Sequence, residues 1–328
     1  MKVVDLHCDT LSELRHGIYR GENIDFGRNN LQIDLEKLRK GDYLLQTFAL
    51  FINLGDPYVP LVTALEQVDL FHHLLEQYAD DIAQVTTMSQ IRSNRQLGKI
   101  SALLSVEDGG CCMGNLSVLR VLYRLGVRMM TLTWNYENEL AYPNQVPGNP
   151  AVLFPCAGNE TQGVKEKGLE FLQEMERLGI LIDVSHLSDA GFWDVFHHTT
   201  KPFIASHSNA RNVCQHVRNL TDDMIRAVAD RGGLTGLNYC ISFVDPQRIR
   251  SSAQQIAEHA AYLRKIGGID CIGLGSDFDG IEGDLELYDA SCMPILEDAL
   301  RKRHFSEDEI EKIFHGNAMR VLSEILPE

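Results

Sequence analysis

The chain opens with a stretch that joins a short apolar run to a cluster of polar residues: Val3-Val4-Asp5-Leu6-His7-Cys8-Asp9-Thr10. The apolar run predicts a buried strand. Side chains alternate between the faces of a strand, so His7 and Asp9 point the same way and Cys8 points the other way. An imidazole beside a carboxylate at a strand end suits a divalent metal ion such as zinc. The alternative is a polar strand end that caps the following helix.

The composition is that of a globular protein: 328 residues, of which 44% are hydrophobic and 23% are charged. The net charge of −16 should repel phosphate backbones, so we expect no nucleic-acid partner. No apolar stretch is long enough to cross a bilayer, and the first residues do not resemble a signal peptide. The eight cysteines show no CxxC pair, which favours reduced thiols. We therefore expect a cytoplasmic protein without a membrane partner.

Eight apolar runs alternate with segments of helical periodicity along the chain. Most runs are continuously apolar, as in parallel strands that are buried on both faces. They cover residues 3–6, 44–52, 100–106, 127–132, 180–184, 203–205, 234–238 and 271–274. This alternation predicts an α/β fold, a (β/α)8 TIM-type barrel. The alternative, a doubly wound sheet, requires a glycine-rich turn after the first strand, where this chain has His7, Cys8 and Asp9.

One long irregular segment, at about residues 137–164, follows the fourth predicted strand and is rich in proline. It would lie at the carboxyl ends of the strands, where a loop of this length is often functional. With this excursion included, the chain predicts a single barrel domain, residues 1–328.

Several predicted helix ends carry local signals. Gly179 is placed to end a helix, Thr221 to cap the start of another, and Ser306 to begin a capping box. Asn317 is predicted to cap the last helix, residues 318–325.

Residues that can bind metals stand at the ends of five predicted strands. In a barrel these ends converge on one mouth, so the side chains should meet. In chain order they are His7 and Asp9, Glu107, His186, His207 and Asp277. The set exceeds what one catalytic zinc needs, so we expect two divalent ions that share Glu107 as a bridge. We expect Zn²⁺, although these ligand types also accept manganese or cobalt.

His7 and Asp9 would then hold one ion, and His186 and His207 the other. Two such ions lower the pKa of a shared water toward about 7, which provides a bridging hydroxide as the nucleophile. The other nine histidines follow no predicted strand, so we assign them no ligand role and expect those in helices to be partly exposed.

Asp277 is predicted to move protons, because a carboxylate beside such a water can take its proton and pass it to a leaving amine. Glu107 and Asp277 would thus be the catalytic carboxylates. Asp279 could substitute for Asp277 or orient it. Arg211 and Arg218 follow the His207 strand, and an arginine near a cationic centre indicates an anionic substrate group such as a carboxylate.

Several motifs, in chain order, resemble those of the membrane (renal) dipeptidase family of dinuclear zinc peptidases, in its bacterial-type soluble branch. They are Val4-Asp5-Leu6-His7-Cys8-Asp9-Thr10, Ser105-Val106-Glu107-Asp108-Gly109-Gly110, Ile182-Asp183-Val184-Ser185-His186, Ala205-Ser206-His207-Ser208-Asn209-Ala210-Arg211, Gly273-Leu274-Gly275-Ser276-Asp277-Phe278-Asp279-Gly280 and Gly316-Asn317-Ala318-Met319-Arg320-Val321. The resemblance spans essentially the whole chain.

This resemblance implies a metallo-dependent hydrolase barrel that hydrolyses free dipeptides and tolerates a D-residue at the C-terminal position. It implies that His7, Asp9, Glu107, His186 and His207 ligate two zinc ions, with Glu107 as the bridge. Family members are commonly homodimers, so a homodimer is also an expectation.

The resemblance also bears on substrate binding. It matches Asp277 to an acid/base that contacts the substrate and Arg218 to an arginine that holds the substrate's carboxylate. One position departs from the mammalian pattern: Trp134 stands where those enzymes have a histidine that steadies the substrate. Trp134 cannot accept a proton, so Asn135 or Tyr136 would stabilise the oxyanion, or Trp134 would form a wall of the pocket or simply pack.

Two other functions use similar barrel mouths. Lactonases, deaminases and lactamases of the amidohydrolase type typically begin with His-x-His rather than His-x-Asp, and Arg218 favours a peptide with a free carboxylate. A metal-binding scaffold without turnover would have no need of Asp277. We therefore predict a binuclear zinc dipeptidase, a metallopeptidase that acts on small dipeptides.

Overall fold

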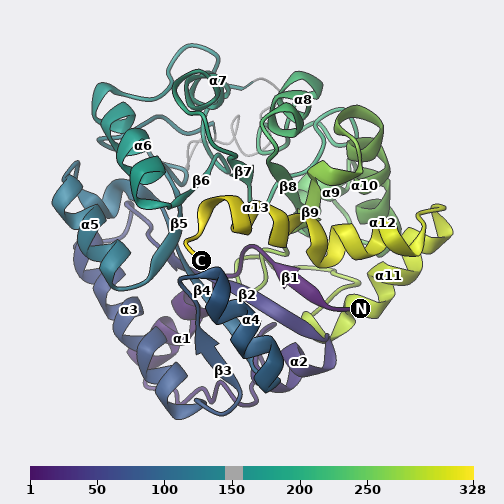
Figure 1. Cartoon of the computed structure of the whole chain (residues 1–328), viewed down its shortest axis with the longest axis horizontal. Coiled ribbons are helices and arrows are strands. Elements are labelled where there is room, and N and C mark those ends of the chain that lie inside the picture. Colours follow the sequence, from purple (N-terminus) through teal and green to yellow (C-terminus); the bar gives the residue numbers. More distant parts are fainter. Residues whose placement is uncertain (145–157) are drawn as a thin grey trace.

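The structure is a computed structural model that describes residues 1–144 and 158–328. Strands and helices alternate along the chain (Figure 1). The strands are β1 (Val3–Asp5), β2 (Tyr43–Phe51), β3 (Ile82–Gln84), β4 (Ile100–Glu107), β5 (Val127–Thr131), β6 (Leu181–Asp183), β7 (Ile204–Ala205), β8 (Leu234–Leu237) and β9 (Ile272–Leu274).

Helices surround the strands on the outside of the sheet, as Figure 1 shows. The α-helices are α1 (Thr10–Tyr19), α2 (Leu35–Lys40), α3 (Pro60–Gln77), α4 (Met88–Leu97), α5 (Leu116–Arg124), α6 (Glu166–Leu178), α7 (Asp189–His198), α8 (Asp222–Asp230), α9 (Ile241–Val244), α10 (Ala253–Gly267), α11 (Met293–Lys302), α12 (Glu307–Glu311) and α13 (Asn317–Ile325). Shorter 3₁₀ turns are η1 (Gly109–Cys112), η2 (Ile269–Cys271) and η3 (Ala290–Cys292), and η4 (Lys312–Gly316) is a π-helical turn.

Eight of the nine strands close into a parallel barrel. They are hydrogen-bonded in the order β2-β1-β9-β8-β7-β6-β5-β4, and the pairing of β2 with β4 closes the ring. That closing pair is long, from Leu45 opposite Ser101 to Phe51 opposite Glu107. The predicted (β/α)8 barrel is confirmed, and each of the eight apolar runs forms one of its strands.

The remaining strand, β3, lies outside the closed ring and was not predicted. It pairs only with residues 100–102 at the beginning of β4, on the edge that β5 occupies from Leu104 onward. Residues 80–87 are mostly polar and form no continuous apolar run, which is the signal that identified the eight barrel strands.

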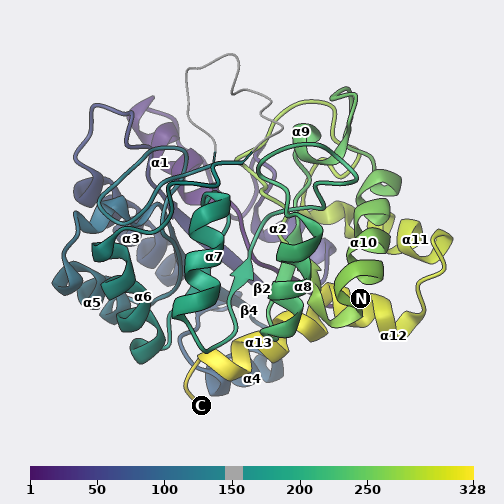
Figure 2. The same cartoon turned by 90° about the horizontal axis from the view of Figure 1, so that it is seen from above.

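The barrel interior is closed at one end by the last helix. Strand side chains and one face of α13 form a single apolar cluster that includes Val4, Leu45, Leu103, Met129, Leu181, Ile204 and Leu234 with Val321, Leu322 and Ile325. These strand residues lie mostly near the beginnings of their strands, so α13 covers the amino-terminal end of the barrel. Figure 2 shows α13 at one end of the molecule and α9 at the other.

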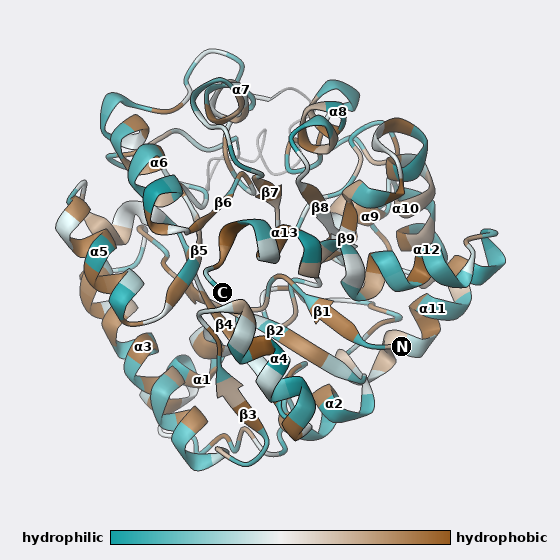
Figure 3. Cartoon of the chain, viewed as in Figure 1, coloured by the Kyte–Doolittle hydropathy of each residue, from teal (hydrophilic) through white to brown (hydrophobic). Residues whose placement is uncertain are grey.

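A second, larger apolar cluster lies between the outer face of the barrel and the helices that surround it. Figure 3 shows predominantly hydrophobic strands, and helices that also carry hydrophilic stretches. Parallel strands covered on both faces in this way need the continuously apolar runs seen in the sequence.

Three of the four predicted helix-end signals are confirmed. Gly179 follows α6 with a left-handed φ of 79°, Thr221 accepts a hydrogen bond from the Met224 N–H, and Ser306 forms a capping box. The prediction for Asn317 is wrong, because the backbone is already helical through η4 and Asn317 itself is helical. Its side-chain amide instead donates to the carbonyls of Ile269 and Ile272.

The predicted excursion at 137–164 lies partly outside the described residues, which omit 145–157. Its two described ends are tied together by hydrogen bonds from Tyr142 N–H to the Gly163 carbonyl and from Lys165 N–H to the Leu140 carbonyl. Within the described ranges, none of the helices combines the length and hydropathy needed to cross a bilayer.

Candidate metal centre and active site

The predicted arrangement at the end of β1 is confirmed. Beyond β1 the backbone continues beside the loop that follows β9, where Cys8 and Phe278 form an isolated parallel β-bridge. His7 and Asp9 face each other, with 3.4 Å between Nε2 and Oδ2, whereas Cys8 is buried in the outer apolar cluster. The Asp9 side chain makes no capping hydrogen bond to α1. The capping alternative therefore does not explain why Asp9 stands here.

Glu107, the last residue of β4, lies between two groups of ligands. Its Oε2 is 3.3 Å from Nε2 of His7, while its Oε1 is 3.0 Å from Nε2 of His186 and 3.7 Å from Nε2 of His207. The two oxygens of one carboxylate thus face separate groups of imidazoles. A bridging carboxylate between two metal ions requires this arrangement.

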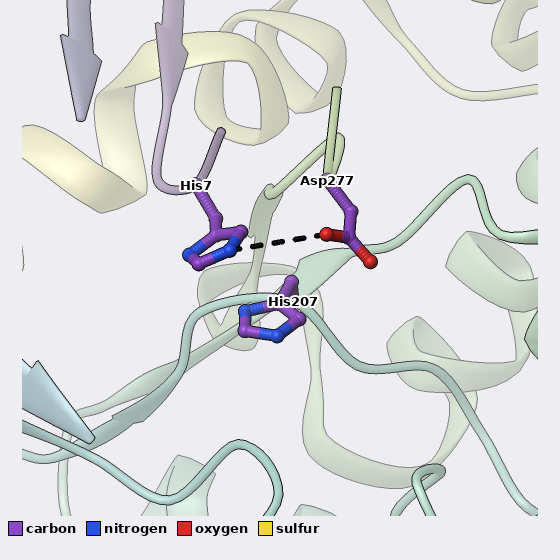
Figure 4. Close-up of side chains that lie close together, drawn as sticks. All are labelled: His7, His207 and Asp277. Carbon is purple, nitrogen blue, oxygen red and sulfur yellow. Dashed lines mark ion pairs between the residues drawn. The ribbon is translucent and has the colours of Figure 1, made fainter. Parts of the chain in front are cut away.

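The two histidines that follow β6 and β7 meet at the same point. Nε2 of His186 and Nε2 of His207 are 3.0 Å apart, and the rings of His7 and His207 stack at 3.9 Å. Asp277 approaches from the β9 loop, with Oδ1 3.8 Å from Nε2 of His7 (Figure 4). All six residues predicted from the strand ends therefore converge on one site.

Three combinations of these side chains place their ligand atoms within 4.8 Å of one another among the described residues: His7, Asp9 and Glu107; Glu107, His186 and His207; and His7, His207 and Asp277. The first two are the two half-sites that the sequence predicts. They share Glu107, and each offers the nitrogen and oxygen donors that zinc prefers.

Several buried nitrogen and oxygen atoms of this site, all able to ligate a metal ion, make no hydrogen bond to any described residue. They are Nε2 of His7, Oδ1 of Asp9 and Oε2 of Glu107. A buried polar atom without a partner is costly, so such atoms in one cluster need an explanation. Cations bound between them would satisfy all three, and these residues therefore fit a pair of divalent metal ions.

The electrostatics of the cluster also fit bound cations. Burial, followed by the charge of Asp9, raises the pKa of Glu107 to about 8. Burial alone would lower the pKa of His7, but Glu107 and Asp9 outweigh it and raise that pKa well above its usual value. Burial lowers the pKa of His186 and of His207, which keeps both imidazoles neutral and able to ligate.

Backbone strain gathers at the same mouth. His186, Asp277 and Asp279 have φ of 68°, 66° and 68°, in the left-handed region that residues other than glycine seldom adopt. Strained residues of this kind are retained where the surrounding structure holds them for a function. Here the left-handed conformation turns the chain at the strand ends and brings His186 and Asp277 to the centre.

The two aspartates of the β9 loop have different surroundings. Oδ2 of Asp277 accepts a hydrogen bond of 2.9 Å from the Asn238 amide, and its other oxygen faces His7. Burial, opposed by the charge of His7, raises the pKa of Asp277 to about 6. Asp279 is held at 2.6 Å by Thr10 Oγ1 and by the backbone N–H of Gln32. Of these two aspartates, Asp277 is the one with an oxygen that faces the cluster of imidazoles and carboxylates.

The two arginines after β7 also differ. Arg211 forms a bidentate ion pair with Asp189, with N–O distances of 2.6 and 2.8 Å. Arg218 is 3% exposed and forms no ion pair with any described residue, although it donates to the His207 carbonyl and faces the ring of Phe243. Burial lowers the pKa of Arg218. A buried guanidinium that no carboxylate of the described residues pairs with directly can receive the carboxylate of a ligand.

A cavity of about 760 Å³ opens over the cluster. Its wall includes Asp9, Glu107, His186, Arg218 and Asp277, so the predicted catalytic and substrate groups share one space. A volume of this size suits a small molecule.

Three consecutive residues after β5, Trp134 to Tyr136, take different positions. Trp134 and Asn135 line the cavity, and Trp134 packs edge-on against Phe51 with ring centroids 4.9 Å apart. The Asn135 side-chain oxygen faces Nδ1 of His186 at 2.9 Å. Tyr136 is not among the residues that line the cavity; its ring packs against that of Trp134 and lies beside Gly55.

Some parts of the site were not predicted. Asn238, which donates to Asp277, ends the seventh predicted strand. Its position at a strand end could have identified it, but an amide is not among the residue types sought as metal ligands. Ser206 contacts Nδ1 of His207, and Asp183 contacts the Ser206 hydroxyl. Residues 30–32 line the cavity although they lie far from any strand end, where the sequence carries no signal.

Among the histidines outside the cluster, His259 differs from its predicted exposure. His259 was expected to be partly exposed, but it is fully buried. It accepts a hydrogen bond from the Ala210 N–H and reaches the Val244 carbonyl with its other nitrogen. His16 and His216 line the cavity, yet neither joins a group of three potential ligands within the described residues.

A parallel eight-stranded barrel with imidazoles and carboxylates gathered at its mouth is the arrangement of metal-dependent hydrolases of the (β/α)8 class. Sequence comparison narrows this class: the family model described as membrane dipeptidase (peptidase family M19) matches residues 1–326. The chain belongs to this family and is a metallopeptidase of it.

Relatives and solved structures agree with this assignment. An uncharacterized dipeptidase of Schizosaccharomyces pombe is 33% identical over 98% of this chain and 79% of its own length. Dipeptidase aclJ of Aspergillus oryzae is 30% identical over 94% of this chain and 73% of its own length. A metallopeptidase from Rhodobacter sphaeroides, solved with a phosphinate mimic of the dipeptide L-Ala-D-Ala, is 25% identical, covers 99% of both chains and has a TM-score of 0.88.

Proposed function

We propose that this chain is a binuclear zinc dipeptidase, a single catalytic domain that hydrolyses free dipeptides. The observation that carries the proposal is the position of Glu107, whose two oxygens face His7 on one side and His186 with His207 on the other. His7 and Asp9 would hold one ion, His186 and His207 the other, and Glu107 both. When bound, the two ions supply a bridging hydroxide as nucleophile and polarise the scissile carbonyl.

Arg218 would bind the C-terminal carboxylate of the dipeptide with its planar guanidinium. Its burial and its lack of an ion pair with any described residue support this role. The predicted consequence is a requirement for a free C-terminus, because an amide leaves the buried charge unpaired. Tolerance of a D-residue at that position is part of the proposal, and the dipeptide mimic bound to the Rhodobacter sphaeroides relative supports it.

Asp277 would carry the proton. Its Oδ2 is occupied by the Asn238 amide, so Oδ1 is the oxygen available to accept a proton from the attacking water. The same oxygen then delivers that proton to the amide nitrogen as the C–N bond breaks, which releases two amino acids. A pKa raised by burial favours this exchange, because a carboxyl group that titrates closer to neutral pH both accepts and donates readily.

The three residues after β5 would have separate roles. We assign Trp134 to the wall of the substrate pocket, beside Phe51. Asn135 would orient His186 through its side-chain oxygen rather than stabilise an oxyanion. Tyr136 would act on the substrate through Trp134, because its ring packs against that of Trp134 and does not line the cavity.

The test combines metal analysis with a panel of dipeptides that includes L-L and L-D pairs, their amides and their N-acetyl forms. We expect about two metal ions per chain and turnover of the free dipeptides alone, since the proposed site is binuclear. Turnover of lactones or nucleobases without turnover of any dipeptide would contradict the proposal.

Two further properties belong to the proposal. A homodimer would use the exposed apolar side chains of α1, of α3 and of the two residues before α3, namely Ile18, Tyr19, Val62, Tyr58 and Val59. Analytical ultracentrifugation of the wild type and of Val62→Glu tests it. A cytoplasmic location agrees with the absence of disulfides among the described cysteines, and cell fractionation tests it.

A further inference from the structure

The side of His207 that faces away from the proposed metals contacts a buried serine and a buried aspartate. Nδ1 of His207 is 2.7 Å from Oγ of Ser206, and that hydroxyl is hydrogen-bonded to Oδ2 of Asp183. Asp183 ends β6 and Ser206 directly follows β7, so paired neighbouring strands bring them together. Both residues are buried, with exposed fractions of 1% and 0%.

The hydrogen atoms of this chain can be assigned from its chemistry. Oδ1 of Asp183 accepts the backbone N–H groups of Ser185 and Ser206, both at 2.9 Å. Hydrogen bonds of this kind favour an ionised carboxylate, which can only accept. The single hydrogen of the Ser206 hydroxyl therefore goes to Asp183, and the Ser206 oxygen is left to accept the hydrogen on Nδ1 of His207.

We propose that Asp183 and Ser206 are positioning residues that fix the tautomer of His207, with hydrogen on Nδ1 and the lone pair on Nε2. This inference rests on the proposed metal centre, because only a nitrogen with a free lone pair can bind a metal ion. In the fixed tautomer the lone pair faces Glu107 and His186, where the second ion would lie.

The neighbouring ligand is held by a weaker partner. His186 also needs its hydrogen on Nδ1, and there it faces the neutral amide oxygen of Asn135 at 2.9 Å. The hydrogen on Nδ1 of His207 instead leads through Ser206 to a negative charge. A charged partner binds a hydrogen more strongly than a neutral one and makes the ring a better donor to metal. His207 is therefore the better-held ligand of the pair.

A comparison with Asp5 shows that this role is particular to Asp183. Asp5 ends β1 and accepts the backbone N–H groups of His7 and Ser276, in the same pattern as Asp183. The Ser276 hydroxyl, however, donates to the His7 carbonyl and not to an imidazole nitrogen. Both aspartates join neighbouring strand ends, but only Asp183 acts on the ring of a ligand.

Asp183→Asn should reverse the tautomer without changing the shape of the site. The N–H groups of Ser185 and Ser206 would keep the amide oxygen at the Oδ1 position, so the amide NH₂ would face the Ser206 hydroxyl. Ser206 would then accept from Asn and turn its own hydrogen toward Nδ1 of His207. The His207 hydrogen would move to Nε2, where it blocks metal binding.

The test uses ¹⁵N-histidine-labelled, metal-free protein, with the His207 signals identified by their loss in His207→Gln. Long-range ¹H–¹⁵N correlations should show hydrogen on Nδ1 in the wild type and on Nε2 in Asp183→Asn. Chelator competition with Zn²⁺ should show about 10- to 100-fold weaker binding of one ion in Asp183→Asn. An unchanged tautomer with unchanged affinity would overturn the proposal.

Two further variants keep the proposal testable if Asp183→Asn fails to fold. Ser206→Ala removes the acceptor for Nδ1, so it should mix the tautomers and weaken the same ion. Ser276→Ala is the matched control, because its hydroxyl lies in the comparable Asp5 arrangement and donates to the His7 carbonyl instead of contacting a ring or Ser206. It should leave tautomer and affinity unchanged, and equal losses in both serine variants would contradict the proposal.

These measurements separate this inference from the proposed function. A wild-type protein that shows the expected tautomer and binds zinc, but hydrolyses no dipeptide, would contradict the proposed function and leave the role of Asp183 and Ser206 intact. A wild-type dipeptidase in which Asp183→Asn changes neither tautomer nor affinity would do the reverse.

Discussion

The two ends of the barrel differ in what their residues contribute. At the amino-terminal end, strand side chains such as Leu45 and Leu181 pack against α13 in a continuous apolar cluster. At the mouth, Glu107, His7 and Asp9 are just as buried but polar, and each has an atom without a hydrogen-bond partner among the described residues. One end therefore stabilises the fold, while the other places costly groups together for chemistry.

This contrast extends to the backbone. His186, Asp277 and Asp279 have left-handed conformations at the mouth, while the residues that α13 covers are in regular strands. The difference leads to opposite expectations for mutations. Changes at the mouth should lower activity at little cost to folding, and changes at the covered end should lower stability at little cost to activity.

The largest effect is expected for Asp277→Asn. Asparagine keeps the shape and tolerates the left-handed backbone, but it cannot accept a proton. The value of kcat should fall by about 10²- to 10⁴-fold, the usual contribution of a general acid–base group, while both metal ions stay bound. Steady-state kinetics and metal analysis check this prediction. Normal turnover would show that Asp277 does not carry the proton.

Asp279→Asn is the control for that variant. It changes the same functional group two residues away, but its carboxylate is held by Thr10 and Gln32 and does not face the ligands. We expect a much smaller loss of kcat and a loosened loop at residues 29–34. A loss as large as that of Asp277→Asn would place Asp279 in the proton path.

Leu322→Ala should have the opposite signature. Leu322 of α13 is fully buried in the apolar cluster that this helix forms with the strands. Its truncation leaves a cavity and should lower the free energy of unfolding by about 2–5 kcal/mol. Denaturant unfolding of metal-free protein measures the loss. The kinetic constants at low temperature should be unchanged, and a loss of activity in the folded variant would break the contrast between the two ends.

His259 should make stability depend on pH. Burial lowers its pKa to about 4 from 6.5, so between these values the unfolded chain binds a proton that the folded chain does not. Stability is therefore lost as the pH falls from 6.5 toward 4, by about 3 kcal/mol in total. Unfolding of chelator-treated wild type and His259→Gln at several pH values isolates this contribution. An identical pH dependence in the two proteins would contradict it.

The smallest effect is expected for Trp134→Phe. Phenylalanine keeps a ring against Phe51 but removes part of the pocket wall, so KM should change by less than about tenfold and stability by about 1 kcal/mol. A kinetic comparison on several dipeptides measures both the size and the selectivity of the change. A large loss of kcat would give Trp134 a part in the chemistry rather than in the wall.

Much of this architecture could be predicted from the sequence, because strand ends in a parallel barrel must converge. His7, Asp9, Glu107, His186 and His207 each follow an apolar run, and that placement alone brings them to one mouth. The strand β3 could not be predicted in this way, since its residues belong to no continuous apolar run. The helical conformation of Asn317 was missed because its amide finds carbonyl partners on η2 and β9 instead of capping.

The substrate side of the site is less accessible to sequence reasoning. Arg211 and Arg218 are equivalent candidates by their position after the strand, the family resemblance favours Arg218, and the ion pair of Arg211 with Asp189 gives the physical reason. Tyr136 is two residues from Trp134, yet Trp134 lines the cavity and Tyr136 does not. Side chains on loops take directions that depend on packing partners far away in the sequence, and spacing does not encode these partners.

The central claim is that Glu107 joins two metal ions at the mouth of the barrel. Zinc titration of metal-free protein, followed by calorimetry, tests it most directly in the wild type and in Glu107→Gln. The account predicts about two ions per wild-type chain and at most one tightly bound ion in Glu107→Gln, because the amide cannot bridge as a carboxylate does. A wild type that binds one ion, or a variant that binds two with unchanged affinity, would contradict the account.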